Sequence, residues 1–389
     1  MGHSHPVAPT HTPRIFGLDA LRAAAILSVT FAHFFAVLYP HVFWLGLFGH
    51  GGYYGVELFF VLSGFLIGEI LIRAGDGLGH GGALPEFYVR RWFRTLPLFW
   101  LLVVINVLLD RWQDGVSRSL PDILQHALFA RNFTWPHLAF LPESWSLAVE
   151  EWFYLLFPAV LWLGLRLKFR FDHVLIFAAL GFYTFSTMMR LRTSGLPEVT
   201  WDVERIVVIH RFDAIMVGVL AAWVSIRFNS LWRRSAWPAA LVGIVLLIAM
   251  YATLWRVEGN WFTSGFDSTF ARVWRFNLVS LGCALLLPAA SGWTLATENF
   301  GSTSIRKIAL WSYAIYLIQH PVSRFVVPRF FRDSATSSGD AWGLFTLLLV
   351  ATIGVSALLH YTYEAPCTRL RQRVGPTVRR IFQKKTDQA

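Results

Sequence analysis

Two ionisable side chains, Arg22 and His33, interrupt an apolar run near the start of the chain, LDALRAAAILSVTFAHFF at residues 18–35. Eleven residues make about three turns of an α-helix, so both groups lie on one face, about 16 Å apart along the axis. A guanidinium binds phosphate oxygens, and an imidazole takes a proton from a hydroxyl near neutral pH. Ionisable groups inside apolar segments are typical of functional sites, although an Asp19–Arg22 pair and a packed histidine also fit this pattern.

Acidic residues open a later apolar segment, PESWSLAVEEWFYLLFP at residues 142–158. Glu150 and Glu151 are consecutive, so on a helix they point about 100° apart, and at most one shares a face with Ser146 and Tyr154. Either carboxylate could fix the tautomer of a histidine that acts as a general base. The sequence leaves open which of the two supports His33.

A basic cluster and several single polar residues lie at the ends of other apolar segments. The stretch YVRRWFRTLP begins such a segment, and its guanidinium forks suit phosphate, although membrane topology alone also places arginines there. The candidate phosphate-binding residues are therefore Arg22, Arg90, Arg91 and Arg94, and the candidate substrate-binding residues are Glu57, Trp145, Ser146, Tyr154, Asp213 and Glu364.

The composition predicts the elements that position these groups. The chain of 389 residues is 55% hydrophobic and only 15% charged, and runs of about 18 or more apolar residues recur along it. We expect an all-α polytopic membrane protein with about ten transmembrane helices. The predicted spans are 16–39, 53–73, 87–109, 147–165, 173–190, 206–226, 236–255, 273–290, 305–327 and 342–363.

Lys and Arg concentrate on one set of the connecting segments, which includes both ends of the chain. This asymmetry predicts that both termini are cytoplasmic, and it accounts for the net charge of +11 without a nucleic-acid partner. We expect a disordered tail at residues 1–15, an integral membrane domain at 16–366, and a basic cytoplasmic tail at 367–389 that faces anionic membrane lipids. The two cysteines have no metal-ligand spacing, so no metal is predicted.

Taken in order, these motifs resemble the acyltransferase family 3 membrane proteins. The first helix has the family's Arg-x10-His pattern as Arg22 and His33, and RRWFR contains its Arg-x-x-Arg as Arg91 and Arg94. GVELFFVLSGFLI is similar to the second-helix signature, with Glu57 where the family usually has Asp. SWSLAVEEWFY, HRFDAIMVG and YEAP also fit, so the resemblance covers essentially the whole chain.

The sequence departs from the family late in the chain. Family members often have a Tyr-Leu-x-His-x-Pro run, but YLIQHPV places Gln319 at the histidine position, with His320 beside it. The resemblance therefore does not assign a role to His320.

The resemblance implies an enzyme of the bacterial cytoplasmic membrane that moves an acyl group, usually acetyl from acetyl-CoA, to a hydroxyl of an extracytoplasmic glycan. It implies that the inner arginines hold the CoA phosphates and that His33 is the catalytic base. An acyl-histidine intermediate stays open as a second route. A lipid or small-molecule acceptor and a glycan transporter or flippase are the alternative functions.

Overall fold

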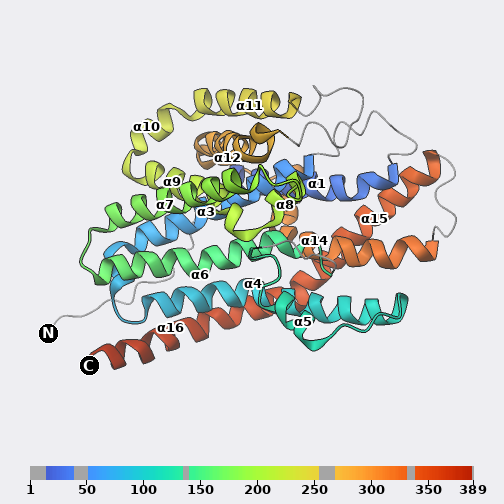
Figure 1. Ribbon diagram of the computed structural model, residues 1–389, viewed down its shortest axis with the longest axis horizontal. Coiled ribbons are helices and arrows are strands. Elements are labelled where there is room, and N and C mark those ends of the chain that lie inside the picture. Colours follow the sequence, from blue (N-terminus) through green and yellow to red (C-terminus); the bar gives the residue numbers. More distant parts are fainter. Residues whose placement is uncertain (1–14, 39–50, 135–139, 254–267, 331–337, 388–389) are drawn as a thin grey trace.

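The computed structural model describes residues 15–38, 51–134, 140–253, 268–330 and 338–387. These residues form α-helices and short helical turns joined by brief connections, and they contain no strand. Seven helical stretches within them are long and apolar enough to cross a membrane. The prediction of an all-α polytopic membrane protein is confirmed, and in Figure 1 most of the long helices lie roughly parallel to the long axis of the molecule.

Each of the ten predicted spans falls on a helix. Seven lie on stretches that meet the requirements for a membrane crossing. The other three are α9 and α11, which have 16 and 17 residues, and α14, which is long but more polar. The long elements are α1 (Phe16–Leu38), α3 (Gly51–Ala74), α4 (Ala83–Gln113), α6 (Ser144–Arg166), α7 (Phe171–Thr193), α9 (Phe212–Arg227), α11 (Ala236–Ala252), α12 (Arg275–Leu285), α14 (Phe300–Phe330), α15 (Ser338–Leu359) and α16 (Ala365–Asp387).

Shorter elements connect these helices. They are η2 (Gly75–Gly79), α5 (Leu120–Ala127), α8 (Trp201–Ile206), η3 (Val208–His210), α10 (Asn229–Arg234), η5 (Phe270–Trp274), α13 (Leu287–Gly292) and η6 (His360–Glu364). Most of them lie between two long helices, but η5 and η6 are π-helical turns that continue directly into α12 and α16. Because α8 and η3 precede it, α9 starts at Phe212 and not at residue 206, as the predicted span 206–226 has it.

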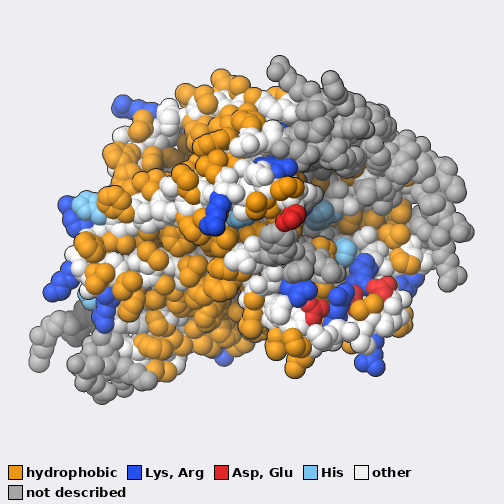
Figure 2. Space-filling view, in the orientation of Figure 1, with side chains coloured by type: hydrophobic (Ala, Val, Ile, Leu, Met, Phe, Trp, Pro, Cys, Tyr) orange, Lys and Arg blue, Asp and Glu red, His pale blue; other side chains and the backbone are white. Residues whose placement is uncertain are grey.

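The surface of the bundle is apolar over much of the face shown in Figure 2, and Lys and Arg side chains lie toward both ends of this face. Phe177 on α7 and Trp237 and Leu241 on α11 are 73%, 81% and 64% exposed. Apolar exposure on this scale is unfavourable in water and favourable against lipid. The exposed face is therefore suited to the acyl chains of a bilayer.

Helix α3 is the central element, packed between α1 and α9. Its crossing with α9 depends on two glycines that lie against each other's helix backbone. A Cβ at Gly64 would overlap the carbonyl oxygen of Ile215, and a Cβ at Gly218 would overlap that of Val61. Small residues allow such close backbone approach in membrane proteins, where dispersion contacts replace the hydrophobic effect as the force between helices.

The C-terminal region is a helix that packs on α4. Helix α15 continues through the π-helical turn η6 into α16, and together they form a long diagonal element in Figure 1. Residues 367–387 of the predicted basic tail are thus helical, and their cytoplasmic location stays a prediction. The predicted N-terminal tail, residues 1–15, lies outside the described residues except for Ile15.

The contact between α3 and α9 gives a first prediction. We expect Gly64→Ala to lower the free energy of unfolding by about 1–3 kcal/mol, because the added methyl group forces two backbones apart. Thermal unfolding in detergent, followed by size-exclusion chromatography of heated samples, measures the effect. Gly354→Ala on α15 is the matched control, since its Cβ would meet nothing within 4 Å. Equal midpoints for the two variants would contradict the packing argument.

Candidate active site

A cavity of about 770 Å³ lies between α1, α3, α4, α6 and α14. This size is typical of sites that bind a cofactor or another small molecule. Its walls combine apolar residues with charged groups and hydroxyls. The polar residues that line it are Asp19, Arg22, Ser63, Glu69, Arg73, Arg91, Arg94, Thr95, Ser146, Glu150, Tyr154, Ser312, Tyr313 and Tyr316.

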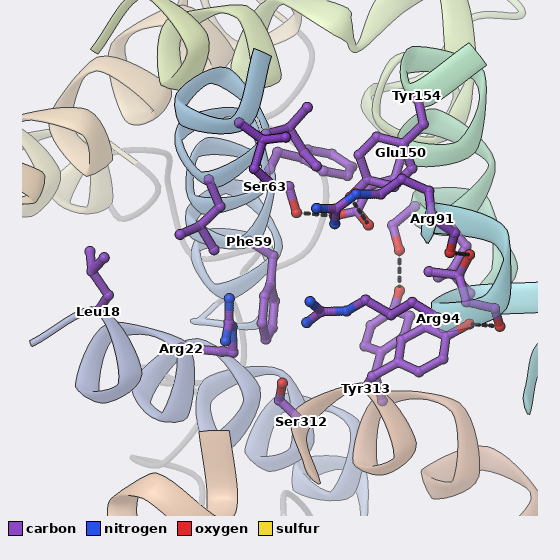
Figure 3. A pocket seen from close by; sticks show the side chains of 18 of the residues that line it. Leu18, Arg22, Phe59, Ser63, Arg91, Arg94, Glu150, Tyr154, Ser312 and Tyr313 are labelled. Carbon is purple, nitrogen blue, oxygen red and sulfur yellow. Dashed lines mark hydrogen bonds between the residues drawn. The ribbon is translucent and has the colours of Figure 1, made fainter. Parts of the chain in front are cut away.

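Arginines form one wall of this cavity. Arg91 and Arg94 are three residues apart on α4, so they share a face, and Figure 3 shows them pointing into the space that Arg22 enters from α1. Arg22 lies 3.9 Å from the Asp19 carboxylate. Within the described part of the chain, Arg91 and Arg94 have no carboxylate within ion-pair distance. Arg91 instead lies over the Tyr154 ring at 5.8 Å. Both side chains are therefore available to an anion that enters the cavity.

A hydrogen-bonded carboxylate faces these arginines (Figure 3). Glu150 accepts hydrogen bonds from Ser63 Oγ at 2.7 Å and from the Tyr154 hydroxyl at 3.2 Å. Ser146, one turn earlier on α6, lies 2.7 Å from the Tyr316 hydroxyl. The structure thus confirms that only one of the two consecutive glutamates shares the face of Ser146 and Tyr154. Glu151 is buried outside the cavity lining.

His33 lies outside the cavity lining and is exposed. Its polar neighbours include Gln319, Arg205 and His320. Within the described residues, neither Glu150 nor Glu151 forms a hydrogen bond or ion pair with His33. The carboxylate support predicted for this histidine is therefore not formed in the structure, because Ser63 and Tyr154 hold Glu150 beside the arginines of α4.

The cavity nevertheless approaches His33 along α1. On α1 the cavity residue nearest His33 in sequence is Arg22. On α3, Val56 lines the cavity, and its neighbour Gly55 packs on α1, where a Cβ would lie 2.6 Å from the Ala25 carbonyl oxygen and 2.8 Å from the Val29 side chain. On this side the cavity therefore reaches a level between Ala25 and Val29, about one to two turns before His33.

Helix α14 shows a similar gap between the cavity and the surroundings of His33. Tyr316 lines the cavity, and Gln319, the polar neighbour of His33, follows it by about one turn. Gln319 is 1% exposed, and its amide lies within hydrogen-bonding range of the His33 imidazole. A buried amide needs a hydrogen-bond partner, so this position can orient the imidazole.

Two predicted substrate-binding residues belong instead to a buried charge network. Glu57 on α3 pairs with Arg211 and accepts a hydrogen bond from Ser280 Oγ at 2.9 Å. Asp213 on α9 pairs with Arg190 of α7 at 2.7 Å. The four charged side chains have no exposed surface. Because the charges compensate each other away from the cavity, their geometry indicates a structural role.

Three other predicted site residues also lie outside the cavity lining. Arg90 is half exposed and pairs with Glu86 at 2.6 Å, since it points away from the face of α4 that carries the other arginines. Trp145 is buried in the core, 5% exposed. Glu364 lies in η6, 2.9 Å from His360 Nδ1.

Several cavity residues give only weak signals in the sequence. Ser63 and Tyr313 are hydroxyls within apolar runs, and such residues also occur as ordinary packing side chains. Arg73 and Glu69 lie at the end of α3, 3.9 Å apart, where a topology signal and an ion pair explain them equally well. In the described residues, no group of three or more His, Cys, Asp or Glu could hold a metal ion.

Glu143 is a buried carboxyl without a distinctive signal in the sequence. It directly precedes α6 and is 4% exposed, and neither carboxylate oxygen has a hydrogen-bond partner in the described residues. Its backbone carbonyl accepts a hydrogen bond from the cavity residue Tyr316 at 2.9 Å. Burial raises the pKa of the Glu143 carboxyl from 4.5 to about 8, against smaller opposite effects of its own backbone N–H and of Arg324.

Comparison with known proteins places the chain among acyltransferases. A family model described as an acyltransferase domain matches residues 15–361. The peptidoglycan O-acetyltransferase OatA of Listeria monocytogenes is 25% identical over 328 residues, which cover 80% of this chain and 50% of that protein. A Staphylococcus aureus protein provisionally named an O-acetyltransferase is 27% identical, over 80% of this chain and 51% of its own length.

A shorter match covers the Bacillus subtilis protein YrhL, provisionally named a peptidoglycan O-acetyltransferase. It is 36% identical over 171 residues, 40% of this chain and 25% of that protein. The chain thus spans about half the length of the Listeria and Staphylococcus relatives. No solved structure matches it.

The burial of Glu143 predicts a dependence of stability on pH. Between about pH 4.5 and 8 the folded protein retains a proton on Glu143 that the unfolded chain has released, so stability falls as pH rises through this range. Glu143→Gln keeps a neutral side chain and should flatten this decline. The measurement is the thermal midpoint in detergent at about pH 5.5 and about pH 8.5. The exposed Glu198, replaced by Gln, is the control and should retain the wild-type decline. If Glu143→Gln declines as steeply as wild type, the assignment is wrong.

Proposed function

Because the chain belongs to the acyltransferase family whose model spans residues 15–361, we propose that it is a membrane O-acyltransferase. It moves an acyl group from cytosolic acyl-CoA to a hydroxyl of an extracytoplasmic glycan. The observation that carries the proposal is the pair Arg91 and Arg94, two cavity arginines without a carboxylate partner in the described residues. The relatives' names favour acetyl as the acyl group and a peptidoglycan-like acceptor.

The arginine wall suits the phosphate-bearing end of acyl-CoA. A planar guanidinium forms paired, charge-assisted hydrogen bonds with phosphate oxygens. Arg91 and Arg94 supply two such groups, and Arg22 adds a third whose charge is partly balanced by Asp19 at 3.9 Å. Glu150 limits the positive charge of the cavity and accepts a hydrogen bond from the Tyr154 hydroxyl. We therefore assign Ser146 and Tyr154 to the acyl donor and not to the acceptor.

The transfer itself is assigned to His33. Its imidazole takes the proton of the acceptor hydroxyl, and the hydroxyl oxygen attacks the thioester carbonyl carbon. The carbon–sulfur bond then breaks, the acyl group stays on the acceptor oxygen, and the CoA thiolate takes the proton back from the histidinium.

Support for the imidazole comes from α14 in this proposal. Gln319 is the buried amide beside His33, and a hydrogen bond from it can hold one ring nitrogen in a fixed orientation. Glu150 acts on the donor side, where its side chain lies among the cavity groups, whereas Glu151 lies outside the cavity lining and is given no role. The donor enters from the arginine wall, and its thioester extends along α1 toward the histidine.

The donor assignment predicts different effects for two arginines of one cluster. Arg94→Gln should raise the KM for acetyl-CoA about tenfold or more, since a hydrogen bond between charged groups contributes about 1.5–3 kcal/mol. Transfer of radiolabelled acetyl groups in inside-out membrane vesicles measures this. Arg90→Gln is the control and should change KM little, because Arg90 pairs with Glu86 outside the cavity lining. Equal KM values for the two variants would refute the arginine wall as the donor site.

The catalytic assignment is tested by His33→Ala. Turnover should fall by a factor of about 10² to 10⁴, the usual contribution of a general base, while acetyl-CoA binding persists. Mass spectrometry of surface glycans should then show loss of the acyl mass that wild-type cells add. His320→Gln, on the neighbouring helix, is the control and should retain most of the turnover. Normal glycan acylation by His33→Ala would rule out this histidine as the base.

A further inference from the structure

The C-terminal helix α16 lies beyond the family match at residues 15–361 and packs on α4, the helix of the arginine wall. Two close contacts define how the helices run. A Cβ at Gly82 would overlap the carbonyl oxygen of Arg379, and a Cβ at Gly375 would lie 3.5 Å from Arg90 Nε. Residue numbers fall on α16 as they rise on α4, so the two helices are antiparallel.

This register places another arginine beside the cavity. Arg371 lies one turn before Gly375 on α16, and Arg94 lies one turn after Arg90 on α4. Because the helices are antiparallel, Arg371 and Arg94 are brought to the same level. Their charges are close enough to interact, and Arg371 also interacts with Arg90 and Arg91.

Two carboxylates near this part of α4 are already engaged. Glu86 pairs with Arg90 at 2.6 Å and with Arg379 at 3.3 Å, and Glu150, which faces Arg94 across the cavity, accepts hydrogen bonds from Ser63 and Tyr154. In the described part of the chain, no carboxylate lies within ion-pair distance of Arg371 or Arg94. Arg371 is half-buried and Arg94 is exposed, and two guanidinium groups that approach one another repel. A bound anion would convert this repulsion into attraction, as it does at phosphate sites built from several arginines.

We propose that Arg371 and Arg94 together hold a phosphate group of acyl-CoA, so that α16 completes the donor site. This inference rests on the proposed function, in which acyl-CoA is the donor. Arg371 is not among the residues that line the cavity; it lies beside the arginine wall, where it would meet the phosphate-bearing end of the donor. The thioester end would extend away from it toward His33.

The experiment compares two donors that differ in their phosphates. Acetyl-CoA carries three phosphate groups, and acetyl-pantetheine carries none. Purified protein in phospholipid-free detergent is assayed with each donor. Arg371→Gln should raise the KM for acetyl-CoA about tenfold, with kcat retained and the KM for acetyl-pantetheine unchanged. Arg371→Lys should recover part of the loss, because it restores the charge without the planar fork.

Arg373→Gln is the matched control, since Arg373 is an exposed arginine on the same helix. It removes the same charge and should behave as wild type. Wild-type affinity of Arg371→Gln for acetyl-CoA would overturn the inference. So would an equal rise in KM for both donors, because that result indicates a structural effect on the cavity.

Two further outcomes distinguish acyl-CoA from lipid headgroups as the source of the phosphate. They also distinguish failure of the proposed function from failure of the role of Arg371. If Arg371→Gln differs from wild type only after anionic phospholipid is added, Arg371 binds lipid headgroups and the inference fails. If wild-type protein neither binds nor uses acetyl-CoA, the proposed function fails first. Saturable wild-type turnover of acetyl-CoA together with an unaffected Arg371→Gln variant rejects the role of Arg371 alone.

Discussion

Arg211 lies between Glu57 and Asp213 in the interior of the helix bundle, and the need to compensate this buried cation constrains how the surrounding helices meet. Glu57 comes from α3, and Asp213 also binds Arg190 of α7 at 2.7 Å. Removing one partner from such a network costs far more than the intact network contributes, because it leaves a charge without compensation in a medium of low dielectric constant. The network therefore fixes α3, α7 and α9 relative to one another, and α3 in turn supports one wall of the cavity.

The arginines of α4 follow the opposite rule. Arg91 and Arg94 project into a cavity without carboxylate partners in the described residues, although partners are present for Arg211 and Arg190. A protein that needed these charges only for structure would pair them in the same way. Their lack of compensation is what makes the cavity suited to a polyanionic ligand, and membership in an acyltransferase family identifies the class of chemistry for which such a ligand would serve.

Strong periodic signals in the sequence identify the helices and part of the site. Each of the ten predicted spans falls on a helix, whereas the long helix α16, which lies in the predicted basic tail, was not predicted. The helical spacing on α6 correctly separates Glu150 from Glu151. Partner choice could not be predicted in the same way. Glu57 and Arg90 have residue types and segment positions that suit a binding site. In the structure, however, Glu57 pairs with Arg211, which is distant in sequence, and Arg90 pairs with Glu86 on its own helix. These pairings depend on which helices are adjacent, and a single sequence does not contain that information in local form.

The face of α1 that carries Arg22 and His33 connects these observations. Arg22 lines the cavity, whereas His33 lies about one to two turns beyond the level between Ala25 and Val29 that the cavity reaches on α3. In the proposed reaction this separation limits hydrolysis, because a base held beside the bound thioester could activate water as well as the acceptor hydroxyl. The donor phosphates are bound by the arginines of α4, and the base lies on the side assigned to the acceptor. The thioester must then extend past the level of Gln319, whose buried amide lies beside the His33 imidazole.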